Sequence, residues 1–260
     1  MSRRGGGPPL IEIKQGIRDG SARVDLIMSS DFPTPFDAVV IGASGGLGAA
    51  IVRRLASDPR VGRIHGFSRR GAVRLDLTDE ASIAAAAATV EGPRLVIVAT
   101  GLLHDEALQP EKRLADLNPE RLARSFQVNA IGPALALKHF APRLPREGKA
   151  VLAVVTARVG SISDNRLGGW YGYRAAKAAA NQFVRTAAVE LAARRKEAIC
   201  VALHPGTVDT PLSAPFQKGV APGRLFTPDH AAERLLAVIE GLTPAQTGGF
   251  FGWDGAAISF

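Results

Sequence analysis

From Asp37 to the end of the chain, short apolar runs alternate with longer stretches that have helical periodicity. This alternation is typical of a parallel sheet covered by helices on both faces. The sequence therefore predicts a doubly wound α/β domain. Seven strands are expected, at Ala38–Ile41, Arg63–Phe67, Ala72–Leu75, Leu95–Ala99, Ala150–Val155, Ile199–Leu203 and Gly249–Gly252.

Helical stretches separate most of these runs, and two of them have clear start signals. Thr78 precedes Asp79 and Glu80, and Thr227 precedes a proline at the first helical position. A hydroxyl before the first turn and a proline within it are typical of helix N-termini. The helices are expected at roughly Gly46–Ser57, Asp79–Thr89, Pro119–Ala141, Tyr173–Arg195 and Pro228–Gly241.

Residues 1–36 lack sustained periodicity and are rich in glycine and proline near the start. We interpret them as a flexible leader, with an arm that clasps a neighbouring subunit as the alternative. No apolar signal-peptide core follows Arg3 and Arg4. The rest of the chain, 37–260, is expected to form one domain.

Composition narrows the functional class. The chain is 46% hydrophobic and 22% charged, which is close to a soluble globular protein, and no apolar run approaches the ~18 residues of a membrane span. A net charge of +8 is scattered in short groups without interleaved aromatic residues, so we expect no nucleic-acid partner. Cys200 is the single cysteine, which excludes an internal disulfide, argues against a metal site and fits a cytoplasmic protein.

A glycine-rich turn directly follows the first predicted strand. It reads Gly42, Ala43, Ser44, Gly45, Gly46, Leu47, Gly48, and a helix comes next. In that order, free backbone N–H groups and the positive end of a helix dipole lie where a pyrophosphate binds. The turn predicts a dinucleotide site, and a tight turn without a ligand is the alternative.

The second strand ends at Phe67 and is followed by Ser68, Arg69 and Arg70. The adenosine ribose of a dinucleotide lies at this position in such folds. An acidic residue there binds the ribose 2′-hydroxyl, whereas arginine suits a 2′-phosphate. The two arginines therefore favour NADP(H), with NAD(H) as the second choice, unless they only form a solvated loop.

Tyr173 and Lys177 stand four residues apart near the start of a long predicted helix, so their side chains project from one face. A free phenol has a pKa of about 10, and an ammonium within ~4–6 Å lowers the pKa by roughly 1–3 units. The spacing predicts that Tyr173 acts as a general acid or base. Tyr171 is expected on another face of the helix.

The order of these motifs over residues 37–260 resembles the short-chain dehydrogenase/reductase family, and residues 160–174 resemble its C-factor and sniffer-type carbonyl reductase branch. The resemblance implies a Rossmann-type fold, a homodimer or homotetramer, and hydride transfer between nicotinamide and a carbonyl or alcohol substrate. Tyr173 would be the proton donor, Lys177 would also bind the nicotinamide ribose, and Asn129 would hold a water. The implied cofactor contacts are Asp76, Leu77, Ala99, Thr100, Gly101, Pro205, Gly206, Thr207 and Val208.

One departure from the family pattern concerns catalysis. The family's carbonyl-polarising serine is replaced by Ala157. Strand alternation turns Thr156 to the opposite side, so Ser161 is our candidate for the missing hydroxyl, with a loop-capping role as its alternative. Loss of one such donor can cost on the order of 10²–10³ in rate. A catalytically impaired signalling or scaffold protein on the same fold is therefore the second hypothesis.

Two milder departures from the family pattern concern the cofactor site. Ala99, Thr100 and Gly101 stand where the family has Asn-Asn-Ala-Gly, and Ile41 stands where it has threonine before the first glycine. The substrate pocket is expected to form from residues 102–108 and 213–225, which contain no recognisable recognition pattern. An aspartate that only starts a helix is the alternative interpretation of Asp76.

Overall fold

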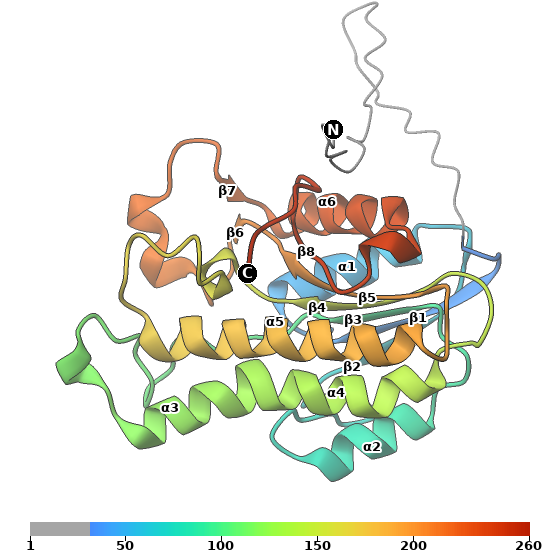
Figure 1. The fold of residues 1–260 in the computed structure, drawn as a ribbon, viewed down its shortest axis with the longest axis horizontal. Helices are drawn as coiled ribbons and strands as arrows, with labels where there is room; N and C mark the ends of the chain where they lie inside the picture. The colour runs from blue at the N-terminus through green and yellow to red at the C-terminus, as the bar shows by residue number, and fades with distance from the viewer. Residues whose placement is uncertain (1–31) are drawn as a thin grey trace, which may run out of the picture.

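The structure is a computed structural model that describes residues 32–260. Its centre is a six-stranded parallel sheet with the strand order β2-β1-β3-β4-β5-β8 (Figure 1). The strands are β1 (Phe36–Ile41), β2 (Val61–Phe67), β3 (Leu95–Val98), β4 (Ala150–Val155), β5 (Ala198–His204) and β8 (Phe250–Gly252). The predicted doubly wound parallel sheet is thus confirmed.

The strand order reverses direction between β1 and β3, which are hydrogen-bonded neighbours. In open α/β sheets, ligands bind outside the carboxyl ends of the strands at such a switch point. The two loops that begin at this point are the glycine turn after Ile41 and the segment after Val98. The topology therefore brings the predicted cofactor residues of both loops to one edge of the sheet.

Two boundaries predicted from the sequence need correction. Ala72–Leu75 is not a strand: only an isolated bridge pairs Ser68 with Arg74, so the sheet has six strands instead of seven. The folded domain also begins before residue 37. Phe36 is the first residue of β1, and the buried Phe32 stacks on it with 4.9 Å between ring centroids. Residues 1–31 of the predicted leader lie outside the described residues.

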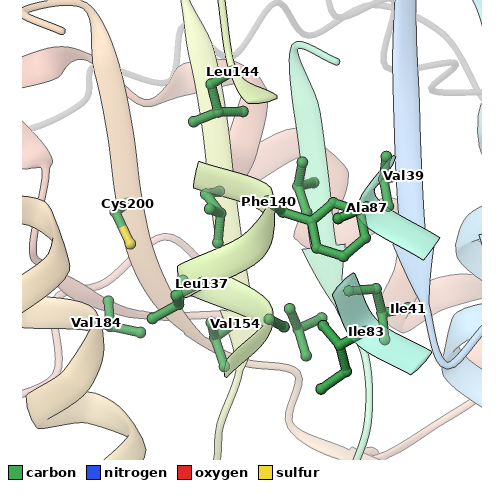
Figure 2. Close-up of a cluster of buried hydrophobic side chains, with 14 of the residues drawn as sticks. Val39, Ile41, Ile83, Ala87, Leu137, Phe140, Leu144, Val154, Val184 and Cys200 are labelled. Carbon is green, nitrogen blue, oxygen red and sulfur yellow. The ribbon is translucent and has the colours of Figure 1, made fainter. Parts of the chain in front are cut away.

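Helices cover both faces of the sheet. Figure 1 shows α1 (Gly46–Ala56) and α6 (Pro228–Gly241) on one side, and α2 (Glu80–Ala88), α4 (Gly132–Phe140) and α5 (Tyr171–Ala192) on the other. The side of α4 and α5 holds a large apolar cluster, in which Leu137 of α4 lies near Val154 of β4 and the ring of Phe140 lies near Ala87 of α2 (Figure 2). Successive side chains along each strand point to opposite faces of the sheet, so each strand contributes to the apolar clusters on both faces. Val154 belongs to this cluster, and Val155 belongs to the cluster under α1 and α6.

Of the two helix N-termini predicted from start signals, one has the expected cap residue. Thr227 accepts a hydrogen bond from the N–H of His230 and caps α6 as predicted, but the cap of α2 is Asp79 instead of Thr78. The expected single helix over Pro119–Ala141 is interrupted. It consists of α3 (Pro119–Phe126), a π-helical turn over Gln127–Ile131 and α4.

A small two-stranded sheet lies outside the main one. It pairs β6 (Thr207–Val208) with β7 (Leu225–Phe226), and the segment between them contains a 3₁₀ turn at Ala214–Gly219. Within residues 32–260, no helix combines the length and apolar character that a membrane crossing needs.

Candidate active site

The glycine turn after β1 is shaped so tightly that side chains are excluded from it. Gly42 has φ +91°, and a Cβ there would lie 2.6 Å from the carbonyl oxygen of Ala99. A Cβ at Gly48 would lie 2.1 Å from the carbonyl oxygen of Gly42. α1 starts at Gly46 after Gly45, with no side-chain cap and no acidic residue in its first turn. Its first N–H groups therefore remain available to an anion, which fits the pyrophosphate of a dinucleotide.

Arg69 and Arg70 are exposed just beyond β2. Neither arginine takes part in an ion pair with any residue of 32–260. Their guanidinium groups are thus free of an acidic ion-pair partner within residues 32–260, at the end of β2, the strand that pairs with β1.

Asp76 has several polar contacts. Burial raises the pKa of its carboxyl, but hydrogen bonds from the N–H and hydroxyl of Thr78, and the charges of Arg74 and Arg69, outweigh this effect and lower the pKa. Arg74 pairs with it at 3.0 Å, while the adjacent Leu77 is buried and lies against Gly132. Asp76 is therefore an anion that organises the turn leading into α2, in line with its helix-entry interpretation.

Tyr173 and Lys177 lie in the first turns of α5, and both are buried, with 9% and 2% of their surfaces exposed. The ammonium of Lys177 donates to the carbonyl oxygens of Val155 at 3.1 Å and Thr100 at 3.5 Å. It also lies 5.7 Å from the centroid of the Tyr173 ring. Lys177 therefore links the ends of β4 and β3 to the phenol beside it.

The pKa of Tyr173 does not shift in the direction that the sequence predicts. Burial raises the pKa of the Tyr173 phenol, whereas the spacing to Lys177 had suggested a lowered value. Burial lowers the pKa of Lys177 to about 8. The physical reason is desolvation, which penalises phenolate and ammonium alike and here exceeds their mutual attraction.

Asn129 is completely buried in the π-helical turn. Its side-chain oxygen accepts from the N–H of Leu102 at 2.9 Å, and its amide donates to the carbonyl oxygen of Leu102 at 2.7 Å. A Cβ at Gly101 would lie 3.7 Å from both the Asn129 oxygen and the Lys177 nitrogen. The side chains of Asn129 and Lys177 therefore converge beside Gly101.

Thr100 precedes this glycine after β3. Its carbonyl oxygen faces Lys177, as described above, and its hydroxyl is buried without a hydrogen-bond partner among residues 32–260. An unpartnered buried hydroxyl beside the cradle is consistent with a missing polar ligand.

The structure does not bring Ser161 into this group of contacts. Its hydroxyl donates to the carbonyl oxygen of Ser259 at 2.5 Å and accepts from the N–H of Asp164 at 3.2 Å. These are the contacts of a loop cap, the alternative role considered for this residue. The hydroxyl of Thr156 is buried and, like that of Thr100, has no hydrogen-bond partner in the described part of the chain. Ala157 itself lies half-buried at the end of β4 in extended conformation.

The segment that leaves β5 passes over the cradle. A Cβ on Gly46 would lie 2.6 Å from the Thr210 methyl carbon, and one on Gly101 would lie 3.5 Å from Leu212. Pro205 and Gly206 connect β5 to β6, and Gly206 has φ +79° beneath the ring of Phe226. The stretch that begins with the predicted contact segment Pro205–Val208 therefore reaches the glycine turn at Thr210 and the loop after β3 at Leu212.

Sequence reasoning missed Glu111 and Trp170, which set the start of α5. The Glu111 carboxylate accepts from the N–H of Gly172 at 3.0 Å, and its backbone carbonyl accepts from the N–H of Trp170. Trp170 has φ +52°, a left-handed conformation that costs a residue other than glycine on the order of 1–3 kcal/mol. The run of glycines around Trp170 was the available signal, but no periodicity links Glu111 to it.

Together, the fold and the site define a dinucleotide-binding α/β domain with a buried Tyr–Lys pair at the carboxyl edge of its sheet. No cluster of three or more histidine, cysteine or acidic side chains that could hold a metal occurs within residues 32–260.

Comparison with known proteins identifies the family. The family model described as enoyl-(acyl carrier protein) reductase matches residues 42–240. A 1-hydroxy-2-glutathionyl-2-methyl-3-butene dehydrogenase of Rhodococcus sp. is 33% identical over 189 residues, which are 72% of this chain and 78% of the relative. The C-signal protein of Myxococcus xanthus is 36% identical over 145 residues, 56% of this chain and 82% of the relative. The chain belongs to the short-chain dehydrogenase/reductase family and is an NAD(P)-dependent enzyme of that family.

Solved structures support the fold. The NADPH-bound carbonyl reductase from chicken fatty liver has a TM-score of 0.77 at 24% identity, covering 89% of this chain and 97% of that one. The carbonyl reductase Sniffer of D. melanogaster has a TM-score of 0.73 at 21% identity, covering 88% and 100%. The predicted resemblance to the sniffer-type branch is confirmed at the level of fold.

Proposed function

We propose that this protein is an NADP-dependent reductase that transfers a hydride between nicotinamide and a carbonyl or alcohol substrate. One observation carries the proposal: the buried Tyr173 and Lys177 lie beside Gly101, Asn129 and the glycine cradle, at a single edge of the sheet. A proton donor and a nucleotide site in such proximity are what carbonyl reduction requires.

Each residue has a distinct task in this mechanism. When bound, the reduced nicotinamide supplies the hydride that goes to the carbonyl carbon. Tyr173 gives its proton to the carbonyl oxygen, so that the product is the alcohol. Lys177 lies next to the phenol as a cation and stabilises the phenolate left behind. Asn129 fixes the loop after β3 through both of its hydrogen bonds to Leu102.

The raised pKa of Tyr173 is compatible with this role. A phenol that stays protonated at neutral pH is ready to donate, and the developing charge on the substrate oxygen supplies the driving force for transfer. The buried Lys177 ammonium lies on the same side and favours the anionic form of the tyrosine once the proton has left.

The cofactor preference rests on Arg69 and Arg70. Both are exposed beyond β2, where each can donate charge-assisted hydrogen bonds to a 2′-phosphate. The fold relative from chicken liver is an NADPH-bound enzyme by its description, which supports the same choice. We therefore expect NADP(H), with NAD(H) as a weaker cofactor.

Ala157 favours the second candidate, a nucleotide-binding protein with little or no turnover. A methyl group stands where the family has a hydroxyl that polarises the carbonyl, and the hydroxyl of Ser161 is engaged with the carbonyl oxygen of Ser259. This candidate predicts tight cofactor binding without reduction of any carbonyl compound.

NADPH oxidation by the purified protein tests the proposal, with a panel of aldehydes, ketones and quinones as substrates. Tyr173→Phe should abolish turnover and leave NADPH binding nearly intact, whereas Lys177→Ala should impair both. Tyr171→Phe is the matched control, because it removes the neighbouring phenol from the first turn of the same helix. Turnover that survives Tyr173→Phe would show that another group donates the proton.

A further inference from the structure

Three aromatic side chains from separate segments form a connected row that starts at the Tyr173 ring. The Trp170 ring lies edge-to-face against Tyr173, with 6.2 Å between centroids and 77° between planes. Phe216 lies 5.1 Å from Trp170 at 66°, and His104 lies 5.5 Å from Phe216 at 71°. The row therefore extends from the proposed proton donor into both segments expected to form the substrate pocket.

The backbone holds this row in place from both sides. His104 donates from Nε2 to the carbonyl oxygen of Pro211 at 3.1 Å, which ties the loop after β3 to the segment after β6. Trp170 is held in its left-handed conformation by the hydrogen bond from its N–H to Glu111. Non-glycine residues remain in this region of φ where the surrounding structure over-determines them, which occurs mostly at functional sites.

The rings are not sealed into a core. Trp170, Phe216 and His104 are each half-buried, in contrast to the fully buried apolar residues beneath the sheet. Steep interplanar angles also mean that the edge of one ring meets the face of the next, so part of each aromatic face stays uncovered by its neighbours. Such faces are suited to a flat ring that arrives from solvent.

We propose that Trp170 and Phe216 form an aromatic clamp that selects carbonyl substrates with an aryl group on the carbonyl carbon. This inference rests on the proposed function, because it places the reacting carbonyl at Tyr173. An aryl ring attached to that carbonyl would lie within reach of Trp170, and Phe216, whose ring centroid is 5.1 Å from that of Trp170, would contact it as an adjoining wall. Aromatic pairs contribute about two- to tenfold in affinity beyond their buried area, so the clamp discriminates aryl from saturated rings of similar size.

The kinetic test compares acetophenone with cyclohexyl methyl ketone, which differ in the aromaticity of one ring. The ratio of their kcat/KM values is measured in the wild-type protein and in Phe216→Leu and Trp170→Leu. Each substitution should lower the aryl-to-cyclohexyl ratio by about three- to tenfold. Intrinsic reactivity cancels, because the same two ketones are compared in every variant. Phe183→Leu, an exposed phenylalanine of α5 outside the row, should leave the ratio unchanged.

A binding test does not depend on turnover. The protein has two tryptophans, so Trp253→Phe leaves Trp170 as the single indole reporter. With NADP⁺ bound, neither ketone can be reduced, and quenching of Trp170 fluorescence then reports equilibrium binding. Acetophenone should bind at least about threefold more tightly than cyclohexyl methyl ketone, and Phe216→Leu should remove the difference.

The two experiments separate failure of the clamp from failure of the reductase. Turnover with an unchanged ratio in both clamp variants would overturn the clamp and leave the reductase proposal standing. Selective aryl binding without any NADPH oxidation would support the clamp and overturn the reductase. Equal binding of both ketones to the NADP⁺ complex would overturn the clamp whatever the kinetics show.

Discussion

The ammonium of Lys177 lies 3.1 Å from the carbonyl oxygen of Val155, the last residue of β4. This contact anchors the helix that carries Tyr173 to the end of a central strand, where the first turns of α5 meet the carboxyl edge of the sheet. Since the cation is almost completely buried, its protonation is coupled to the stability of the fold.

The first prediction concerns this coupling. Burial lowers the Lys177 pKa from 10.5 to about 8, so the folded protein binds fewer protons than the unfolded chain between these values. Stability contributed by this site therefore rises as pH increases through that window, and the burial penalty is fully present below about pH 8. Relative to Lys177→Met, the wild-type protein should gain about 2–3 kcal/mol between neutral pH and pH ~10.

Urea denaturation of both proteins at the two pH values measures this gain. The comparison between variants cancels the other titrating groups, among them Cys200, whose pKa burial raises to about 12. Lys138→Met, an exposed lysine of α4, serves as the control and should show no such pH dependence. If the difference in unfolding free energy between the wild-type protein and Lys177→Met stays constant with pH, Lys177 is not desolvated.

Cofactor selectivity is the second prediction. NADPH should bind about tenfold or more tightly than NADH, and the double variant Arg69→Ala with Arg70→Ala should lose this preference, because the charge-assisted hydrogen bonds to the 2′-phosphate are gone. Fluorescence titration of the reduced nucleotides measures both affinities. Arg63→Ala removes another exposed arginine of β2 as a control. Equal affinities of the wild-type protein for NADPH and NADH would contradict the proposed role of Arg69 and Arg70.

A third prediction distinguishes the two positions considered for the polarising hydroxyl. Ala157→Ser should raise kcat about tenfold or more, since it returns a donor to the end of β4. Ser161→Ala should act on stability, lowering the free energy of unfolding by about 1 kcal/mol through the lost hydrogen bond to Ser259. Steady-state kinetics and urea denaturation of both variants test this. A large loss of kcat in Ser161→Ala, on the order of 10²–10³, would instead assign the donor role to Ser161.

The fourth prediction is a homodimer or homotetramer. A groove of about 740 Å³ runs between α4 and α5, and Phe183 and Leu137 are among its lining residues. Phe183 is 44% exposed there. Burial of this ring and the apolar part of the groove against a second subunit would stabilise an oligomer. Light scattering should give the mass of a dimer or tetramer, and Phe183→Glu should reduce it to that of a monomer. A monomeric wild-type protein at micromolar concentration would contradict the prediction.

Sequence patterns predicted the parallel sheet and the tight glycine turn after β1 well, because strand burial and glycine turns are local properties. The false strand at Ala72–Leu75 shows the limit of this reasoning. Leu75 is buried in the core as its apolar character suggests, but Val73 is 39% exposed and only a single bridge forms, at Arg74. Apolar residues therefore indicated burial there without indicating which backbone conformation provides it.

Features that depend on packing between distant segments could not be predicted. The π-helical turn that carries Asn129 differs from an α-helix by one residue in its hydrogen bonds, and apolar periodicity does not register this difference. The pKa of Tyr173 was expected to fall because of Lys177, but it rises because the whole phenol is desolvated, a property that only the folded surroundings determine. Contacts of Ser161 with Ser259 are equally invisible in the sequence.

Glu111 has a consequence for engineering. Its carboxylate and its backbone carbonyl accept hydrogen bonds from the N–H groups of Gly172 and Trp170, so the loop after β3 also fixes the start of α5, the helix that carries Tyr173. A loop transplanted from a relative to change specificity would therefore move the phenol of Tyr173 unless it carried an acidic residue at this position. Under the proposed mechanism, changes in the loop after β3 and the position of the Tyr173 phenol are therefore coupled through Glu111.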